Sequence, residues 1–162
     1  MLNARDCDHI SDFSALKDIC ELQDLSEIEL IFEACDKMAD ISWLEPWETG
    51  LSKLDSLHLY FGSTWKLENF EPLRIVGKFT TLKQLDLVFA GISDIDFIGE
   101  FANLTQLCKL KIHIMNDGIN DLTNFDQLGK LGKLKKLQNL NLHFNHIGQN
   151  RNAVVVFLRR GE

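Results

Sequence analysis

A six-residue pattern, L-x-x-L-x-L, occurs five times along this chain of 162 residues. The copies begin 29, 28, 25 and 30 residues apart. That spacing is typical of units that each form one strand and one short helix, which run to roughly 20–30 residues. The copies are Leu25-Ile28-Leu30, Leu54-Leu57-Leu59, Leu82-Leu85-Leu87, Leu107-Leu110-Ile112 and Leu137-Leu140-Leu142. The repetition predicts a solenoid whose function lies on a face and not in a pocket.

A position outside the pattern supports the register of the predicted strands. Side chains alternate along a strand, so the fourth and sixth positions face one way and the eighth should join them. The eighth positions are Phe32, Phe61, Phe89, Ile114 and Phe144. Because a shift by one residue would turn all of these side chains toward solvent, the apolar column fixes which face is buried.

A second apolar series follows each predicted strand. It recurs every three residues, sometimes four, which predicts short helices or 3₁₀ segments behind the sheet. In the third copy the series is Ile92, Ile95, Ile98, Phe101 and Leu104, and in the fourth it is Ile119, Leu122, Phe125, Leu128, Leu131 and Leu134. The polar residues of Ile92-Ser93-Asp94-Ile95 and Ile119-Asn120-Asp121-Leu122 are predicted helix N-caps. We interpret Trp43, Trp47 and Trp65 as core packing in the longer, irregular segments that follow the first two predicted strands.

With these motifs, residues 7–150 resemble the leucine-rich-repeat family. The stretches Ile92-Ser93-Asp94-Ile95 and Ala102-Asn103-Leu104-Thr105-Gln106-Leu107 are similar to the short repeats of internalins and phosphatase-regulatory subunits. The repeat lengths and the stretch from Leu140 to Gly148 are closer to the longer, ribonuclease-inhibitor-like repeats. The resemblance implies an α/β fold, a right-handed, horseshoe-like solenoid with a parallel sheet on its concave face and short helices or 3₁₀ segments behind.

The chain departs from the family at the position three residues after the last strand leucine. The family usually has Asn or Cys there, and its side chain ties successive turns together. This chain has Glu33, Gly62, Ala90, Met115 and Asn145. We therefore expect other contacts to hold the turns, with less regular curvature.

The repeats divide the chain into three parts. Residues 1–24 are a partial repeat or N-terminal cap, with a helical series from Ile10 to Leu22 and no clear strand. Residues 25–147 hold the five repeats. Residues 148–162 contain the apolar run 153–158, which is either a C-terminal cap or a truncated sixth repeat.

Charge and composition narrow the choice of partners and compartment. The net charge of −7 divides into −9 for residues 1–81 and +2 for residues 82–162, and an acidic chain disfavours nucleic acid. No segment has the apolar length of a signal peptide or a membrane span. Cys7, Cys20, Cys35 and Cys108 lack metal-ligand spacing and fit structural thiols in a reducing compartment. We expect a cytoplasmic protein without membrane contact.

The outward positions of the five strands form the predicted binding face, because parallel strands stack them side by side about 4.8 Å apart. By copy these positions are Glu27, Glu29, Ile31; Ser56, His58, Tyr60; Gln84, Asp86, Val88; Lys109, Lys111, His113; and Asn139, Asn141, His143. The twelve predicted partner contacts among them are Glu27, Glu29, Ile31, His58, Tyr60, Asp86, Val88, Lys109, Lys111, His113, Asn141 and His143.

This face is acidic at Glu27 and Glu29, basic at Lys109 and Lys111, and crossed by an exposed apolar stripe of Ile31, Tyr60 and Val88. It predicts an adaptor, regulatory subunit or effector that binds a protein partner. Strand propensity alone could also explain the stripe.

An alternative function is a structural component of a larger assembly that docks by its ends or its back. Motifs of phosphate loops, hydrolases and metalloproteases do not occur, so we expect no enzyme, no small-molecule substrate and no cofactor. The neighbours His113 and His143 suggest no metal site, because no further ligand is evident.

Overall fold

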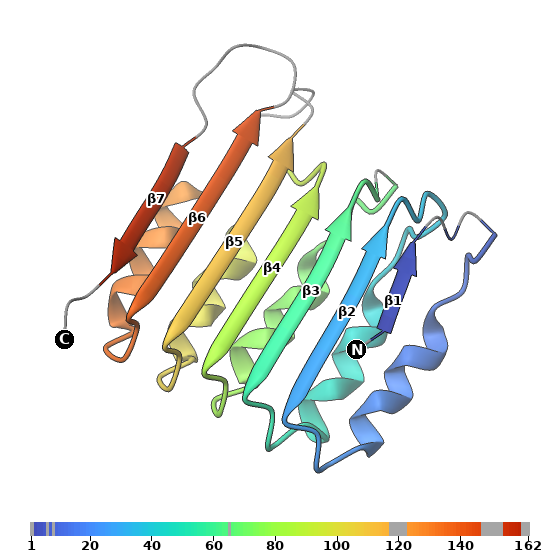
Figure 1. The fold of residues 1–162 in the computed structure, drawn as a ribbon, viewed down its shortest axis with the longest axis horizontal. Helices are drawn as coiled ribbons and strands as arrows, with labels where there is room; N and C mark the ends of the chain where they lie inside the picture. The colour runs from blue at the N-terminus through green and yellow to red at the C-terminus, as the bar shows by residue number, and fades with distance from the viewer. Residues whose placement is uncertain are drawn as a thin grey trace.

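The computed structural model describes residues 2–5, 7, 9–64, 66–116, 123–146 and 154–159. Strands stand side by side in one sheet, in chain order, with 3₁₀ helices packed behind it (Figure 1). The strands are β1 (Leu2–Arg5), β2 (Glu27–Glu33), β3 (Ser56–Gly62), β4 (Gln84–Ala90), β5 (Lys109–Asn116), β6 (Asn139–His146) and β7 (Val154–Arg159). The helices are η1 (Ser14–Glu21), η2 (Ser42–Thr49), η3 (Glu71–Lys78), η4 (Asp96–Asn103) and η5 (Phe125–Lys133).

Strands β1 to β6 are parallel, and β7 pairs antiparallel with β6. A 3₁₀ helix connects each parallel strand to the next in the described part of the chain. The predicted α/β solenoid, with a parallel sheet and short 3₁₀ helices behind it, is therefore confirmed. Within the described residues, no helix is long and apolar enough to span a membrane.

The predicted strand register is also confirmed. Phe32 pairs with Phe61, Phe61 with Phe89, Phe89 with Ile114, and Ile114 with Phe144. These five side chains are buried. The phenyl rings of Phe32 and Phe61 stack with centroids 5.6 Å apart, and those of Phe61 and Phe89 stack 6.1 Å apart. The eighth position of each repeat thus forms one column through the core.

The spacing of apolar residues explains why the helices are 3₁₀. A 3₁₀ helix has three residues per turn, so apolar side chains spaced by three lie on a single face. In η3 and its flanks the buried series is Phe70, Leu73, Val76, Phe79 and Leu82. The helix ends with the Phe79 N–H donating to the Val76 carbonyl, a bond that spans three residues.

Asp or Asn side chains start four of the helices. Oδ1 of Asp12, Asp40, Asn69 and Asp94 accepts the backbone N–H two residues later, at the first residue of each helix, over 2.8 to 3.0 Å. The predicted cap Ile119-Asn120-Asp121-Leu122 lies outside the described residues, and η5 begins at Phe125.

Backbone hydrogen bonds connect successive repeats. The carbonyls of Ser26, Asp55, Lys83 and Cys108, just before consecutive strands, each accept two N–H groups from the next repeat at 2.8 to 3.0 Å. The buried Cys35 thiol adds a contact of 3.5 Å to the Ala4 carbonyl. These bonds lie on both sides of the strands and link neighbouring turns.

The tryptophans of the second helix fill the core behind the sheet. Trp43 and Trp47 are buried, with ring centroids 5.4 Å apart. The Trp47 indole Nε1 donates to the Leu16 carbonyl over 2.9 Å and ties η2 to η1. Trp65 lies outside the described residues.

The two ends of the chain differ from the interior repeats. Residues 1–24 contain η1 and also the strand β1, so the expectation of no strand there was wrong. The alternation of Leu2 and Ala4 with polar residues is too short to stand out in the sequence. At the other end, β7 runs opposite to the repeat strands, which favours a cap over a truncated sixth repeat. We keep the capping role of both ends as a proposal.

The turn after a strand adopts a left-handed backbone conformation in three repeats. Ala34, Ser63 and Gly91 follow β2, β3 and β4, with φ of 53°, 57° and 71°. This conformation costs about 1–2 kcal/mol for a residue with a Cβ, whereas glycine adopts it without that cost. Two of these turns are therefore strained by their side chains.

We predict that Ala34→Gly raises the free energy of unfolding by about 0.5–1 kcal/mol, because relief of strain exceeds the added flexibility of the unfolded chain. The matched change Gly91→Ala should lower it by about 0.5–1 kcal/mol, because the same two effects act in the opposite direction. Urea denaturation at constant m-value measures both. Shifts of the same sign in the two variants would contradict this explanation.

Candidate functional site: the outer face of the sheet

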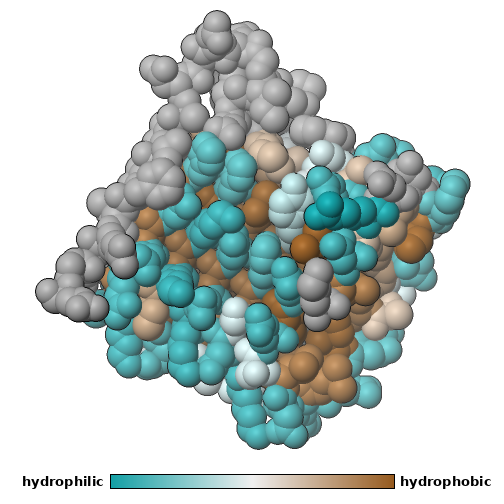
Figure 2. Space-filling view, in the orientation of Figure 1, coloured by the Kyte–Doolittle hydropathy of each residue, from teal (hydrophilic) through white to brown (hydrophobic). Residues whose placement is uncertain are grey.

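The strand register places the predicted contact residues in three columns across the outer face of the sheet. The third-position column contains Glu27, Ser56, Gln84, Lys109 and Asn139; the fifth contains Glu29, His58, Asp86, Lys111 and Asn141; the seventh contains Ile31, Tyr60, Val88, His113 and His143. All fifteen lie on the opposite face from the core column of phenylalanines, since side chains alternate. The structure therefore brings them together on one surface, which faces the viewer in Figure 2 and is largely hydrophilic.

Acidic and basic side chains alternate over the first four positions of the fifth column. Nδ1 of His58 lies 3.7 Å from Oε1 of Glu29, and Nζ of Lys111 donates to Oδ2 of Asp86 over 3.1 Å. The second of these pairs joins adjacent strands β4 and β5. The sequence predicted an acidic end at Glu27 and Glu29 and a basic end at Lys109 and Lys111. In the structure Glu29 has a basic neighbour in His58, and Lys111 has an acidic neighbour in Asp86, so the two ends are less strongly charged than predicted.

Three polar atoms in this column are buried without a hydrogen-bond partner among the described residues. They are Nε2 of His58, Oδ1 of Asp86 and Oδ1 of Asn141. An unpaired buried polar atom costs about 1–3 kcal/mol, so native proteins usually satisfy it. The column thus has unused capacity for hydrogen bonds with another molecule.

A hollow of about 380 Å³ lies over these atoms. Residues from five neighbouring strands line it, including Glu29, His58, Asp86, Lys111 and Asn141. The floor is formed by the third and fifth columns. The hollow spans strands β2 to β6, so this face is concave where its polar side chains gather.

The seventh column is less exposed than expected. Val88 is only 3% exposed, so the prediction that it belongs to an exposed stripe was wrong. Val88 is not part of the core cluster behind the sheet. It lies on the outer face between Tyr60 and His113, and these larger neighbours in the same column shield it. The accessible apolar surface here comes from Ile31 and Tyr60, both half-buried.

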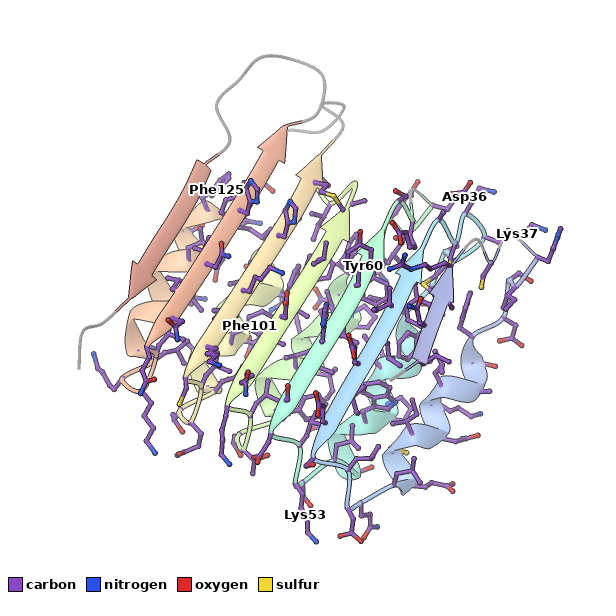
Figure 3. All side chains as sticks on the ribbon, in the orientation of Figure 1. Asp36, Lys37, Lys53, Tyr60, Phe101 and Phe125 are labelled. Carbon is purple, nitrogen blue, oxygen red and sulfur yellow. The ribbon has the colours of Figure 1, made fainter. Side chains whose placement is uncertain are left out.

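Tyr60 leans along its strand over a glycine. A Cβ added to Gly62 would lie 2.6 Å from the Tyr60 hydroxyl oxygen, so only glycine leaves room for this ring. Burial raises the pKa of the Tyr60 phenol, and the nearby Glu33 carboxylate raises it further. The ring therefore offers a flat, neutral surface at the rim of the face (Figure 3).

Two residues of the face were missed by the sequence reasoning because β1 was not predicted. Asn3 extends the seventh column beyond Ile31, and Arg5 pairs with Glu33 over 3.2 Å between Nε and Oε2. The only signal was the polar alternation of Asn3 and Arg5 within four residues.

His113 and His143 stack with ring centroids 4.4 Å apart and an interplanar angle of 11°. Burial lowers the pKa of His113, and electrostatic repulsion from His143 and Lys111 lowers it further, whereas Asp86 acts in the opposite direction. The described residues contain no group of three or more His, Cys, Asp or Glu side chains that could hold a metal ion. The two rings thus make a face-to-face contact across strands β5 and β6.

We predict that acidification from pH 7.5 to 5.5 destabilises the protein less in the His113→Gln variant than in the wild type. A histidine with a lowered pKa stays neutral in the fold while an unfolded histidine, with a pKa of about 6.5, binds its proton, so stability falls with pH. The pKa values of Asp12, Asp40 and Asp94 are lowered, so these carboxyls stay ionised in this range.

Chemical denaturation at the two pH values measures the effect. The control is His9→Gln, which removes an exposed histidine outside the sheet and should follow the wild type. An equal loss of stability in wild type and His113→Gln would contradict the prediction.

Comparisons with known proteins add little beyond the fold. No protein-family model and no curated protein matches the chain. Among solved structures, an internalin (InlF) from Listeria monocytogenes is similar at 25% sequence identity and a TM-score of 0.42, and the match covers 82% of this chain and 39% of the internalin. The chain thus spans less than half the length of that protein. The repeated motif, the strand register and the 3₁₀ helix behind each strand describe the fold of this chain as a repeat solenoid.

Proposed function

We propose that this chain is a protein-interaction module that binds a protein partner through the outer face of its sheet. The observation that carries the proposal is the hollow with three buried, unpaired polar atoms on His58, Asp86 and Asn141. A partner that hydrogen-bonds to these atoms recovers free energy that the isolated chain loses. The five strands extend over roughly 20–25 Å, enough for a contact of about 800 Å² per partner.

The chemistry of the unpaired atoms suggests what the partner presents. Oδ1 of Asp86 accepts hydrogen bonds, and so does Oδ1 of Asn141 as its amide is oriented. A partner with N–H donors, such as amide or guanidinium groups, therefore fits the middle of the face. Apolar side chains would pack on Ile31 and Tyr60 at its edge. An adaptor, regulatory subunit or effector acting in the cytoplasm remains the proposed role.

Eleven of the twelve contact residues predicted from the sequence keep their proposed role, and Val88 is left out. Val88 supports its neighbours and does not itself contact the partner, because it is already buried. The remaining eleven lie on the accessible part of the face.

A charge swap within the Asp86–Lys111 pair tests the face without breaking the pair. The double variant Asp86→Lys, Lys111→Asp keeps an ion pair and the net charge while reversing the charges that a partner meets. We predict at least a tenfold loss of affinity for proteins captured from the source cells by the wild type. Affinity capture with quantitative mass spectrometry, followed by binding measurements on the purified partner, provides the readout.

The matched control is the double variant Glu48→Lys, Lys78→Glu, which reverses an ion pair of 3.7 Å on the helix side. It should retain the partner. Loss of the partner only in this control, or retention in both variants, would refute binding by the sheet face.

Replacing Tyr60 by Ala should weaken binding of the same partner by about tenfold or more, because tyrosine is enriched among the interface residues whose truncation costs about 2 kcal/mol or more. Tyr60 lies outside the core cluster, so the fold should persist, as circular dichroism and thermal unfolding would report. Tyr60→Phe keeps the ring and should retain most of the affinity. Equal affinity of Tyr60→Ala and wild type would remove Tyr60 from the contact.

A further inference from the structure

Two cysteines follow the paired strands β1 and β2 at the same distance along the chain. Arg5 and Glu33 are partners across these strands. Cys7 comes two residues after Arg5, and Cys35 comes two residues after Glu33. Asp36 directly follows Cys35 and marks this corner of the sheet in Figure 3. The two cysteines thus occupy the same position in successive repeats.

The turns that contain these cysteines have the same hydrogen bonds. The Cys7 carbonyl accepts the backbone N–H of Ile10 over 3.0 Å, and the Cys35 carbonyl accepts that of Met38 over 2.9 Å. In each turn the cysteine Sγ also approaches the carbonyl oxygen two residues earlier, at 3.6 Å for Cys7 and 3.7 Å for Cys35. The two turns are therefore equivalent in their backbone and in the direction of the cysteine side chain.

The Cys35 thiol reaches from the second repeat to the first. Its Sγ lies 3.5 Å from the carbonyl oxygen of Ala4 in β1. Both cysteines lie on the core side, because Cys35 is buried in the core cluster and Cys7 packs against that cluster. The Cys35 side chain is therefore directed toward the repeat that contains Cys7.

The spacing of the repeats suits a bond between these two sulfurs. Equivalent positions on neighbouring parallel strands lie about 4.8 Å apart. A disulfide joins cysteines whose Cα atoms are about 4.4–6.8 Å apart. A bond between Cys7 and Cys35 therefore needs rotation of side chains and no rearrangement of the strands. Cys20 and Cys108 have no cysteine at an equivalent position in the adjacent repeat.

We propose that Cys7 and Cys35 form a disulfide when the protein meets hydrogen peroxide, and that a thiol reductant reverses it. Cys7 is the more exposed of the two, so its sulfur gives up a proton, attacks a peroxide oxygen and becomes a sulfenic acid, with release of one water. The Cys35 sulfur then attacks Sγ of Cys7. The S–S bond forms, and the sulfenic oxygen leaves with the Cys35 proton as a second water. The two thiols are oxidised by two electrons, and one peroxide is reduced to two waters.

The bond strengthens the part of the fold that burial anchors least. In β1 only Ala4 is partly buried, and η1 contains no buried residue, whereas η2, η3 and η4 each contain several. The loop that the bond closes contains η1 and β2, and its two cysteines are 28 residues apart. Closing such a loop restricts the unfolded chain and so stabilises the fold. Oxidation thus also fixes the edge of the outer face where Arg5 pairs with Glu33.

Mild oxidation of the full chain with hydrogen peroxide tests the proposal. The intact mass should fall by the mass of two hydrogens, and alkylation of the unfolded chain should find two thiols where the untreated protein has four. Peptide mapping without reductant should recover Cys7 linked to Cys35. The midpoint of thermal unfolding should rise by about 5 °C or more. Dithiothreitol should reverse all of these changes.

Three variants show which thiols react. Cys7→Ser should lose neither the two hydrogens nor gain in thermal midpoint, whereas the matched control Cys108→Ser should respond like the wild type. In Cys35→Ala the reaction should stop at the sulfenic acid of Cys7, which dimedone labels. A wild type that keeps four alkylatable thiols, a bond between other cysteines, or a Cys7→Ser variant that responds like the wild type would overturn the proposal.

Discussion

The stacking of aromatic side chains in the eighth column of the sheet is the interaction on which the rest of the structure depends. Phe32, Phe61 and Phe89 stack nearly parallel across neighbouring strands, with interplanar angles of 10°. Phe32 and Phe89 also meet aromatic residues that directly precede the helices, edge to face, Phe32 with Phe13 and Phe89 with Phe70. The column therefore binds strand to strand, and two of its rings also bind the sheet to the segments behind it. Removing one such ring typically costs about 3–5 kcal/mol.

This buried column also determines where function can lie. Because strand side chains alternate, fixing the phenylalanines on the inside fixes three other columns on the outside. The inner columns are constrained by packing, whereas the outer columns are free to carry charge. The chain uses this freedom in the fifth column, where Glu29, His58, Asp86 and Lys111 alternate acidic with basic groups. Part of that polarity is satisfied internally, and the unpaired remainder lies in the hollow.

The sequence predicted the features that repeat and missed those that depend on neighbours in space. Strand register and the 3₁₀ segments followed from apolar spacing, because those periods reflect local geometry. The burial of Val88 depends on the size of Tyr60 and His113 in adjacent strands, which no single repeat reveals. The strand β1 is held by backbone pairing with β2 and contains little apolar pattern of its own. The predicted register already placed Asp86 beside Lys111, but the contact of 3.1 Å between their side chains depends on side-chain conformations that the sequence pattern does not reveal.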